Sequence, residues 1–233
     1  MTFLQITQSL LGGFAYTCLI FFLTLVLSIP LGLVISFGLM AKWKPLKAVL
    51  NVIIWVIRGI PLMLQIYMVY YLPGILNNGS SFWGDVDKFL FFNLGIENGG
   101  AFIAVIVSFA INYACYFAVI FKGGIEGVSR GQTEAGKVLG LNKKQIFRKV
   151  ILLQLIKKIT PPMSNEIITL VKDTALSNTI GIVETIRAAS NFASGFPPII
   201  WPIFYSGIFY LLFVGLLTIL FNFVEKKLSF YKE

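Results

Sequence analysis

The amino-acid sequence predicts an all-α polytopic membrane protein. Hydrophobic residues make up 57% of the 233 residues and charged residues only 12%, and the mean hydropathy is +0.84. Soluble domains have roughly half apolar and a quarter charged residues, so this composition excludes an ordinary soluble domain. The apolar residues also gather in runs of about 20 or more, the length that a helix needs to cross the roughly 30 Å hydrocarbon core of a bilayer.

The chain lacks the residues that many catalytic and metal sites require. It has no histidine and only two cysteines, Cys18 and Cys115. This excludes histidine-based catalysis, the usual zinc sites and a dense disulfide scaffold. Both cysteines lie within apolar runs, and we interpret them as packing residues.

Five apolar runs are expected to be transmembrane helices. They lie at about 10–40, within 48–72, and at 101–121, 163–183 and 200–223. An odd number of spans puts the two ends of the chain on opposite sides. The first basic residue is Lys42, so the first run lacks the basic start of a removable signal peptide and is expected to remain as a span.

The distribution of charge predicts the orientation. With the N-terminus outside, the inner segments 41–47, 122–162 and 224–233 carry fifteen Lys or Arg residues and the outer segments carry two. Glu184 is among the four acidic residues assigned to the outer segments. The positive-inside rule therefore places the N-terminus outside and the C-terminus inside. The net charge of +9 is mostly an orientation signal, not a sign of nucleic-acid binding.

Two acidic residues in the fourth run are candidates for function, because a charge inside a membrane costs a few kcal/mol unless it is paired or hydrated. Glu166 and Asp173 are seven residues apart, which at about 100° per residue puts both on one helix face. Two aligned carboxylates indicate a site for a cationic group. The alternative is structural: Glu166 anchors a span end or pairs with Arg58, and Arg58 and Lys172 snorkel or pair with the acids.

The second run is interrupted by Arg58-Gly59-Ile60-Pro61. A charge, a flexible residue and a helix breaker together are typical of a broken helix that lines a cavity. Freed backbone groups there could bind a carboxylate, and Arg58 could assist. A proline kink without a ligand role is the alternative.

The inner segment 122–162 is expected to form two short helices. The first, 133–140, ends at Gly140, the residue best suited to a left-handed helix end. Asn142 caps the second, with Gln145 at capping-box spacing, and Pro161 and Pro162 stop that helix or begin the next span. Two helices with a basic face and an apolar stripe can dock into a groove on a partner protein.

Residues 131–138 nearly match the phosphate-binding pattern GxxxxGK[ST], but we do not expect a nucleotide site there. Val138 has no hydroxyl for magnesium, no buried strand precedes Gly131, and Glu134 would repel phosphates. No cofactor is expected to bind this chain.

Several segments resemble one protein family. Glu134-Ala135-Gly136, Gly140 and the run to Pro161-Pro162 resemble the EAA loop of bacterial ABC-importer permeases, which couples the permease to its ATPase. The flanking segments resemble, in the same order, the polar amino acid permease family of glutamine, histidine and arginine type: 58–62, 121–125, 130–132 and 170–176. Two residues depart from the family pattern. Gly136 stands where Ala is usual, which would add flexibility, and Leu153 stands where Pro is usual, which would leave the helix straighter.

The resemblance implies a type I ABC importer permease fold: one transmembrane permease domain, 1–233, in the bacterial inner membrane, with a coupling loop at about 122–162. Its implied partners are a second permease chain, identical or related, two ATP-binding cassette ATPase subunits that hold ATP and magnesium, and an extracytoplasmic solute-binding protein. The coupling residues would be Glu134, Ala135, Gly136, Gly140, Asn142 and Lys143.

The resemblance also implies a transport function by alternating access, with ATP hydrolysis on the partner and none on this chain. Family members that move basic amino acids have acids at the positions of Glu166 and Asp173. We therefore expect arginine, lysine, ornithine or histidine as substrate, with Glu166 on the side-chain cation, Asp173 supporting it or the α-amino group, and Arg58 assisting. Alternatives are import of neutral polar amino acids such as glutamine, an ion-coupled secondary carrier or channel, and a membrane anchor for a complex.

Overall fold

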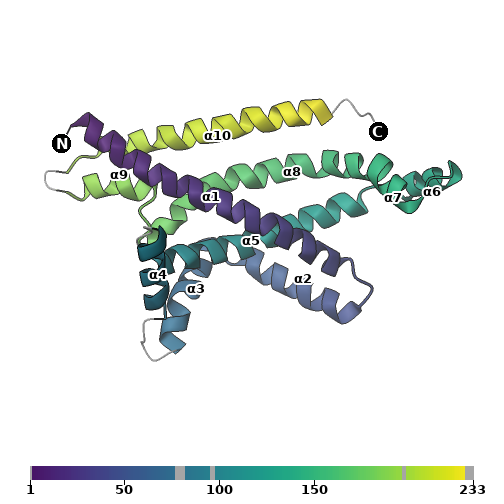
Figure 1. The fold of residues 1–233 in the computed structure, drawn as a ribbon, viewed down its shortest axis with the longest axis horizontal. Helices are drawn as coiled ribbons and strands as arrows, with labels where there is room; N and C mark the ends of the chain where they lie inside the picture. The colour runs from purple at the N-terminus through teal and green to yellow at the C-terminus, as the bar shows by residue number, and fades with distance from the viewer. Residues whose placement is uncertain (1, 77–81, 95–97, 196–197, 229–233) are drawn as a thin grey trace.

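The computed structural model describes residues 2–76, 82–94, 98–195 and 198–228, and the regular elements in these ranges are all helical, as the sequence predicts. Three long apolar helices run along the length of the molecule (Figure 1): α1 (Phe3–Leu39), α5 (Gly99–Glu126) and α10 (Trp201–Leu228). They extend the expected first, third and fifth spans by several residues. Each is long enough to cross a bilayer.

The core lies where α1, α5 and α8 (Leu152–Asp173) pack together, and it is built from large side chains such as Phe21, Phe109 and Leu170. A glycine lets α1 and α5 come close. A Cβ atom on Gly32 would lie 2.8 Å from the Cβ atom of Phe117, closer than real Cβ contacts come. This packing holds α5 as the central helix, and α5 in turn forms one wall of the cavity described below.

The second apolar run is broken, as predicted. It forms α2 (Lys44–Gly59) and α3 (Leu62–Leu76), whose axes differ by 104°. Pro61 supplies no backbone N–H and restricts the residue before it, which ends α2. The run is therefore not one straight helix, and the bend is much larger than that of an ordinary proline kink.

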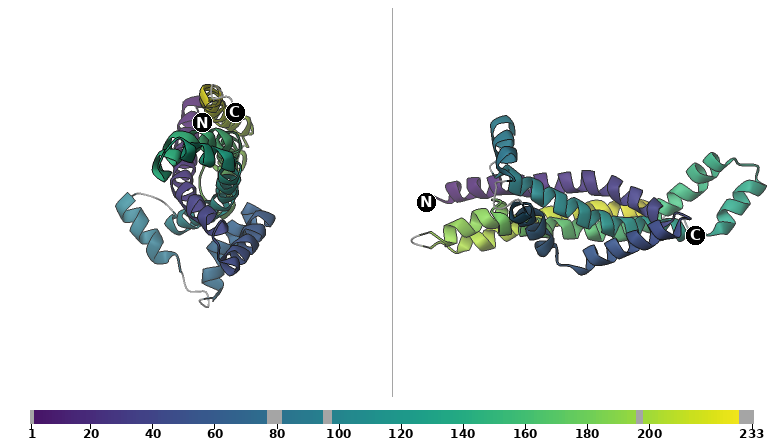
Figure 2. Two further views of the ribbon diagram at one scale, coloured as in Figure 1. Left: turned by 90° about the vertical axis from the view of Figure 1, so that its right-hand side faces the viewer. Right: turned by 90° about the horizontal axis from the view of Figure 1, so that it is seen from below.

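The inner segment forms a helical hairpin that leads directly into the fourth expected span. Its elements are α6 (Arg130–Val138), α7 (Lys143–Ile146), a π-helical segment (Phe147–Ile151) and α8. The chain stays helical through Leu153, where the family usually has proline. The helix is not regular α-helix throughout, because the π-helical segment ends just before Leu152. Figure 2 shows the hairpin projecting beyond one end of the bundle.

The expectation that Pro161 and Pro162 stop a helix or begin a new one is wrong. Both lie inside α8, which continues to Asp173. Each proline removes one intrahelical hydrogen bond, but α8 is packed between α5 and α10, and tertiary packing outweighs the local preference.

The fourth expected span, 163–183, is only partly α-helical. After Asp173 the chain continues as a 3-10 helix (Thr174–Ile180), turns at Gly181 with a left-handed φ of +92°, and enters α9 (Thr185–Ala193). Within the described ranges, three helices, or four with the bent pair, are long and apolar enough to span a membrane. The count of five spans and the orientation therefore stay predictions.

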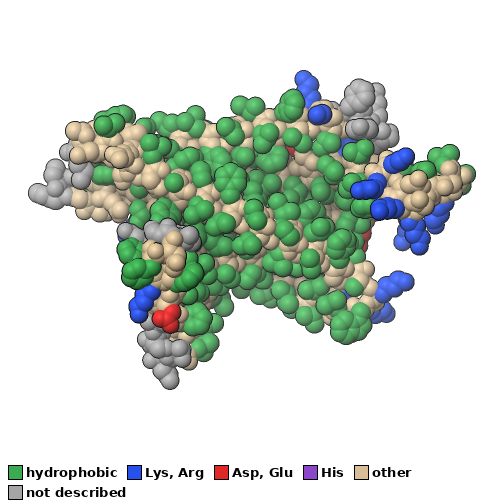
Figure 3. Space-filling model, viewed as in Figure 1, with side chains coloured by type: hydrophobic (Ala, Val, Ile, Leu, Met, Phe, Trp, Pro, Cys, Tyr) green, Lys and Arg blue, Asp and Glu red, His purple; other side chains and the backbone are tan. Residues whose placement is uncertain are grey.

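The surface of the bundle is that of a membrane protein. Hydrophobic side chains cover most of the visible face in Figure 3, and most of the visible Lys and Arg side chains gather at the end near α6 and α7. A short helix, α4 (Gly84–Leu94), crosses the long axis near the opposite end (Figure 1). The charge separation matches the pattern on which the predicted orientation rests.

Candidate functional site

A cavity of about 590 Å³ opens where the α2–α3 break faces α5 and α8. Its volume is in the range of small-molecule sites. All three predicted binding residues, Arg58, Glu166 and Asp173, line it. The remaining lining residues come from the same elements and, for Leu176, from the 3-10 helix that follows α8: Gly59, Ile60, Pro61, Leu62, Asn112, Tyr113, Tyr116, Thr169 and Leu176.

The two acids face the cavity from α8, and both are partly buried. Asp173 accepts a hydrogen bond from the Tyr113 hydroxyl at 2.7 Å, and Tyr113 is itself buried on α5. Within the described parts of the chain, the Glu166 carboxylate accepts no hydrogen bond. The cavity therefore contains one carboxylate that the protein holds in place and one that can turn toward a ligand.

Arg58 lies at the end of α2, exposed, with its guanidinium carbon 4.7 Å from the centroid of the Tyr116 ring. This is a cation–π geometry. Among the described residues it forms no ion pair with Glu166 or Asp173, and the alternative in which Arg58 pairs with Glu166 stays a prediction. Lys172 is exposed and does not line the cavity.

The break itself is held by Gln65, a residue that the sequence analysis did not single out. Its side-chain amide donates to the carbonyl oxygens of Ile57 and Ile60, both at 2.8 Å, and its own oxygen accepts from Asn112 at 3.2 Å. The carbonyls freed by the bend are thus satisfied. The first turn of α3 borders the cavity at Leu62; the N–H groups of Leu64 and Gln65 donate to the carbonyl oxygen of Pro61, and those of Leu62 and Met63 precede the first bond within the helix.

The cavity therefore has a positive and a negative side. Arg58 and the N-terminal end of α3 form the positive side, and the two acids on α8 form the negative side. A zwitterion with an additional cationic group fits such an arrangement. Sequence reasoning missed Tyr113 and Tyr116, although the polar pair Asn112-Tyr113 inside an apolar run was an available signal.

The predicted coupling residues all lie on the projecting hairpin. Glu134, Ala135, Gly140, Asn142 and Lys143 are exposed, and Gly136 is buried. The hairpin also exposes Val138 (88%) and Leu139 (77%). Two exposed apolar side chains beside a carboxylate and several lysines form a surface suited to a protein partner.

The turns of the hairpin have the predicted geometry. Asn142 and Gln145 form a capping box with reciprocal hydrogen bonds of 2.9 Å, and Gly140 has a left-handed φ of +73°. Gly136 has a packing role: a Cβ atom there would lie 2.8 Å from Cγ1 of Ile146, so the glycine lets α6 and α7 touch. Residues 131–138 are helical, which removes the loop geometry that a phosphate-binding motif needs.

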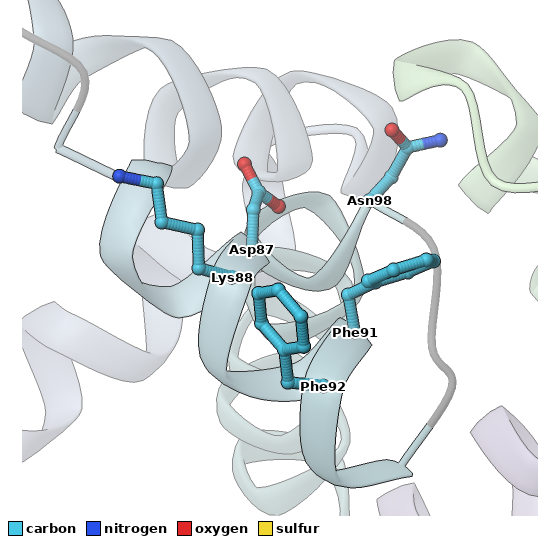
Figure 4. Close-up of a pocket in the computed structure, with 5 residues that line it drawn as sticks. All are labelled: Asp87, Lys88, Phe91, Phe92 and Asn98. Atoms are coloured by element: carbon cyan, nitrogen blue, oxygen red, sulfur yellow. The ribbon is translucent and has the colours of Figure 1, made fainter.

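A second hollow, of about 450 Å³, lies on α4 and is the less suitable candidate. Figure 4 shows Phe91 and Phe92 on its rim, with Lys88 turned away from Asn98. Asp87, the acid among its described lining residues, already accepts a hydrogen bond from the backbone N–H of Gly100 at 2.7 Å. The aspartate therefore caps α5 and has a structural role.

Known proteins with similar sequence and structure include amino acid permeases. The chain is 29% identical to the L-cystine transport system permease protein of Bacillus subtilis, over 94% of this chain and 86% of that protein. It is 29% identical to the arginine transport system permease protein of the same organism, over 94% of this chain and 92% of that protein. It resembles the crystal structure of an amino acid ABC transporter with histidines, with a TM-score of 0.76, 29% identity, and coverage of 97% of this chain and 99% of that chain.

Residues 28–230 match the family described as the binding-protein-dependent transport system inner membrane component. The match covers most of the chain and includes the broken helix, the cavity and the hairpin. It confirms the family that the sequence motifs indicated, and with it the location in the inner membrane. The chain belongs to the family of binding-protein-dependent transport system inner membrane components.

Proposed function

We propose that this chain is the permease subunit of an ATP-driven amino acid importer, and that its substrate has a cationic side chain: arginine, lysine, ornithine or histidine. The observation that carries the proposal is the cavity with Arg58 on one side and Glu166 and Asp173 on the other. The similarity to permeases named for arginine and cystine supports the amino acid class.

In this proposal each side of the cavity has its own role. The substrate α-carboxylate lies toward Arg58 and the first turn of α3, where N–H groups and the helix dipole favour an anion. The side-chain cation lies against Glu166, which accepts no hydrogen bond from the described protein, and Asp173 supports it or the α-amino group. Tyr113 positions Asp173 through the 2.7 Å hydrogen bond.

The chain works by alternating access in complex with other proteins. An extracytoplasmic solute-binding protein delivers the amino acid, a second permease chain completes the pathway, and two ATPase subunits bind ATP and magnesium and hydrolyse the nucleotide. The hairpin at about 122–162 docks on the ATPase through Glu134, Ala135, Gly136, Gly140, Asn142 and Lys143. Because α7 leads through the π-helical segment into α8, a movement of the hairpin is transmitted directly to the helix that carries both acids.

The proposed topology is five spans with the N-terminus outside and the C-terminus inside. The bent pair α2–α3 and helix α8 supply the second and fourth crossings beside α1, α5 and α10. The basic end near the hairpin then faces the cytoplasm, where the ATPase lies.

Substrate-stimulated ATP hydrolysis tests the proposal. The chain is reconstituted with its ATPase and binding protein, and arginine, lysine, histidine, glutamine and glutamate are compared with and without Glu166→Gln. Stimulation by basic amino acids alone, abolished by the substitution, is the expected result. Equal stimulation by glutamine with a silent Glu166→Gln would assign neutral polar amino acids instead, with selectivity in the binding protein.

The docking role of the hairpin has a separate test. Glu134→Lys reverses one exposed charge without touching the cavity, so the complex is expected to insert in the membrane normally and to lose stimulated ATP hydrolysis. Asp85→Lys, the same reversal of charge at an exposed acid outside the segment 122–162, serves as the matched control. Normal transport by Glu134→Lys would contradict the assignment.

A further inference from the structure

A second polar cleft lies on the other side of α8, between α8 and the last turns of α10. It consists of two adjoining hollows of about 430 and 230 Å³ that share Pro161, Asn222 and Glu225. Lys157 and Lys226 line the larger hollow. The cleft does not overlap the substrate cavity, since Arg58, Glu166 and Asp173 line neither hollow.

The cleft combines both signs of charge in one place. Glu225 contributes a carboxylate, whose Oε1 atom accepts a hydrogen bond from the hydroxyl of Ser164 at 3.0 Å. Ser164 is buried, and its hydroxyl also lies 2.8 Å from the carbonyl oxygen of Pro161, so the two acceptors share one donor on the α8 side. Lys157 and Lys226 contribute ammonium groups, and Thr160 and Asn222 add neutral hydrogen-bonding groups. Such a set recognises a ligand that has both an anionic and a cationic group.

The position of the cleft indicates where that ligand comes from. α10 is a long apolar helix whose last turn carries Lys226 and Lys227, the usual mark of the membrane interface. Toward the middle of the same helix, Leu216, Ile219 and Phe223 are exposed. A molecule with its polar head in the cleft would have an apolar surface along α10 for acyl chains, whereas a free ion would use only the head site.

We propose that the cleft between α8 and α10 binds the headgroup of a phospholipid with a primary amine, of the phosphatidylethanolamine class. The phosphate lies between Lys157 and Lys226, the side-chain amide of Asn222 donates a hydrogen bond to its oxygens, and the lipid ammonium donates to Glu225. Because α8 carries the substrate acids and continues into the hairpin, the bound lipid braces the moving helix against α10. The inference does not depend on which amino acid is transported.

Lipid retention by the purified permease–ATPase complex tests the proposal. Nanodiscs contain phosphatidylglycerol and either phosphatidylethanolamine or phosphatidylcholine, and native mass spectrometry measures which lipid stays bound. Phosphatidylcholine keeps the positive charge but has no N–H to donate. A charge-assisted hydrogen bond predicts a preference for phosphatidylethanolamine of about tenfold, and Glu225→Gln is expected to abolish it.

Two further variants make the outcome unambiguous. Glu126→Gln, an exposed acid outside the cleft, is expected to keep the preference. Asn222→Leu fills the cleft without changing charge and is expected to lose retention, which provides a second variant if Glu225→Gln fails to assemble. Equal retention of the two lipids by the unmodified complex, or an unchanged preference in assembled Glu225→Gln or Asn222→Leu, would overturn the proposal.

Discussion

Asp173 and Glu184 are eleven residues apart in the sequence, yet the fold surrounds their carboxylates very differently. Glu184 is fully buried (0% exposed) and accepts three hydrogen bonds, from the backbone N–H groups of Ile186 and Arg187 and from the Tyr210 hydroxyl, at 2.7 to 2.8 Å. Asp173 is partly exposed and accepts one, from Tyr113. Glu166, on the same face of α8, accepts none from the described residues.

The difference separates a structural acid from acids available to a ligand. Glu184 caps α9 and joins it to α10, beside a hydrogen bond of 2.9 Å between Thr17 and Thr185. The three hydrogen bonds take up most of the roughly four acceptor positions of its carboxylate, so it has little capacity for a substrate. The acids of α8 keep unoccupied lone pairs that face the cavity, which is the arrangement a cationic ligand requires.

The largest expected effect comes from removing the structural acid. Glu184→Ala removes the acceptor of the Tyr210 hydroxyl and of two backbone N–H groups at a buried site, which costs at least about 3 kcal/mol at roughly 1 to 3 kcal/mol per group. We expect a lower yield of assembled complex and a melting temperature in detergent that falls by several degrees. Glu184→Gln keeps one acceptor oxygen and should be milder. A Glu184→Ala complex as stable as the unmodified one would contradict the structural role of Glu184.

Substitution of a cavity acid should impair transport and leave stability nearly unchanged, the reverse of the effect expected at Glu184. Asp173→Asn keeps the size of the side chain and an acceptor for Tyr113, and it removes only the charge. We expect uptake of basic amino acids to fall at least tenfold, the loss of one charge-assisted interaction of about 1.5 to 3 kcal/mol, while the melting temperature stays within a degree or two. Transport assays in proteoliposomes measure the first quantity and thermal unfolding of the same preparation measures the second.

The smallest expected effects come from removing the hydroxyl of Tyr113 or of Tyr210, which form a matched pair. Each hydroxyl donates to one of the compared carboxylates, Tyr113 to Asp173 at 2.7 Å and Tyr210 to Glu184 at 2.8 Å. Tyr113→Phe should weaken substrate affinity about fivefold, or roughly 1 kcal/mol, with little change in stability. Tyr210→Phe should lower stability by a similar free energy and leave affinity unchanged. The same response in both variants would mean that the two regions do not differ in role.

The sequence predicts the positions of the two cavity acids and of the helix break. It does not predict the burial of Glu184. The heptad spacing placed Glu166 and Asp173 on one face, and the motif at Arg58 to Pro61 indicated the break, because both depend on local geometry. From the sequence, Glu184 is only one of the four acidic residues of the outer segments. Its burial depends on α1 and α10, and a Cβ atom on Gly13 of α1 would lie 2.8 Å from the Glu184 carbonyl oxygen, a contact between residues far apart in sequence.

Other features were beyond sequence reasoning for the same reason. The Gln65 side chain reaches back over the bend and meets Asn112 of α5, so its role exists only after the helices have packed. The helix through Pro161 likewise depends on the packing of α8 between its neighbours. At Gly136 the sequence indicated flexibility, whereas the structure shows close packing against Ile146. In each case a long-range contact outweighs the local preference.

Equilibrium binding of arginine and citrulline to the permease–ATPase complex, without the binding protein, tests the central claim most directly. Citrulline has nearly the same shape as arginine and lacks its positive charge, so the ratio of the two dissociation constants reports what the acids on α8 recognise. We predict that the unmodified complex binds arginine at least about tenfold more tightly and that Glu166→Gln reduces the ratio to about two. Equal affinity for the two ligands, or a ratio unchanged by Glu166→Gln, would contradict the account.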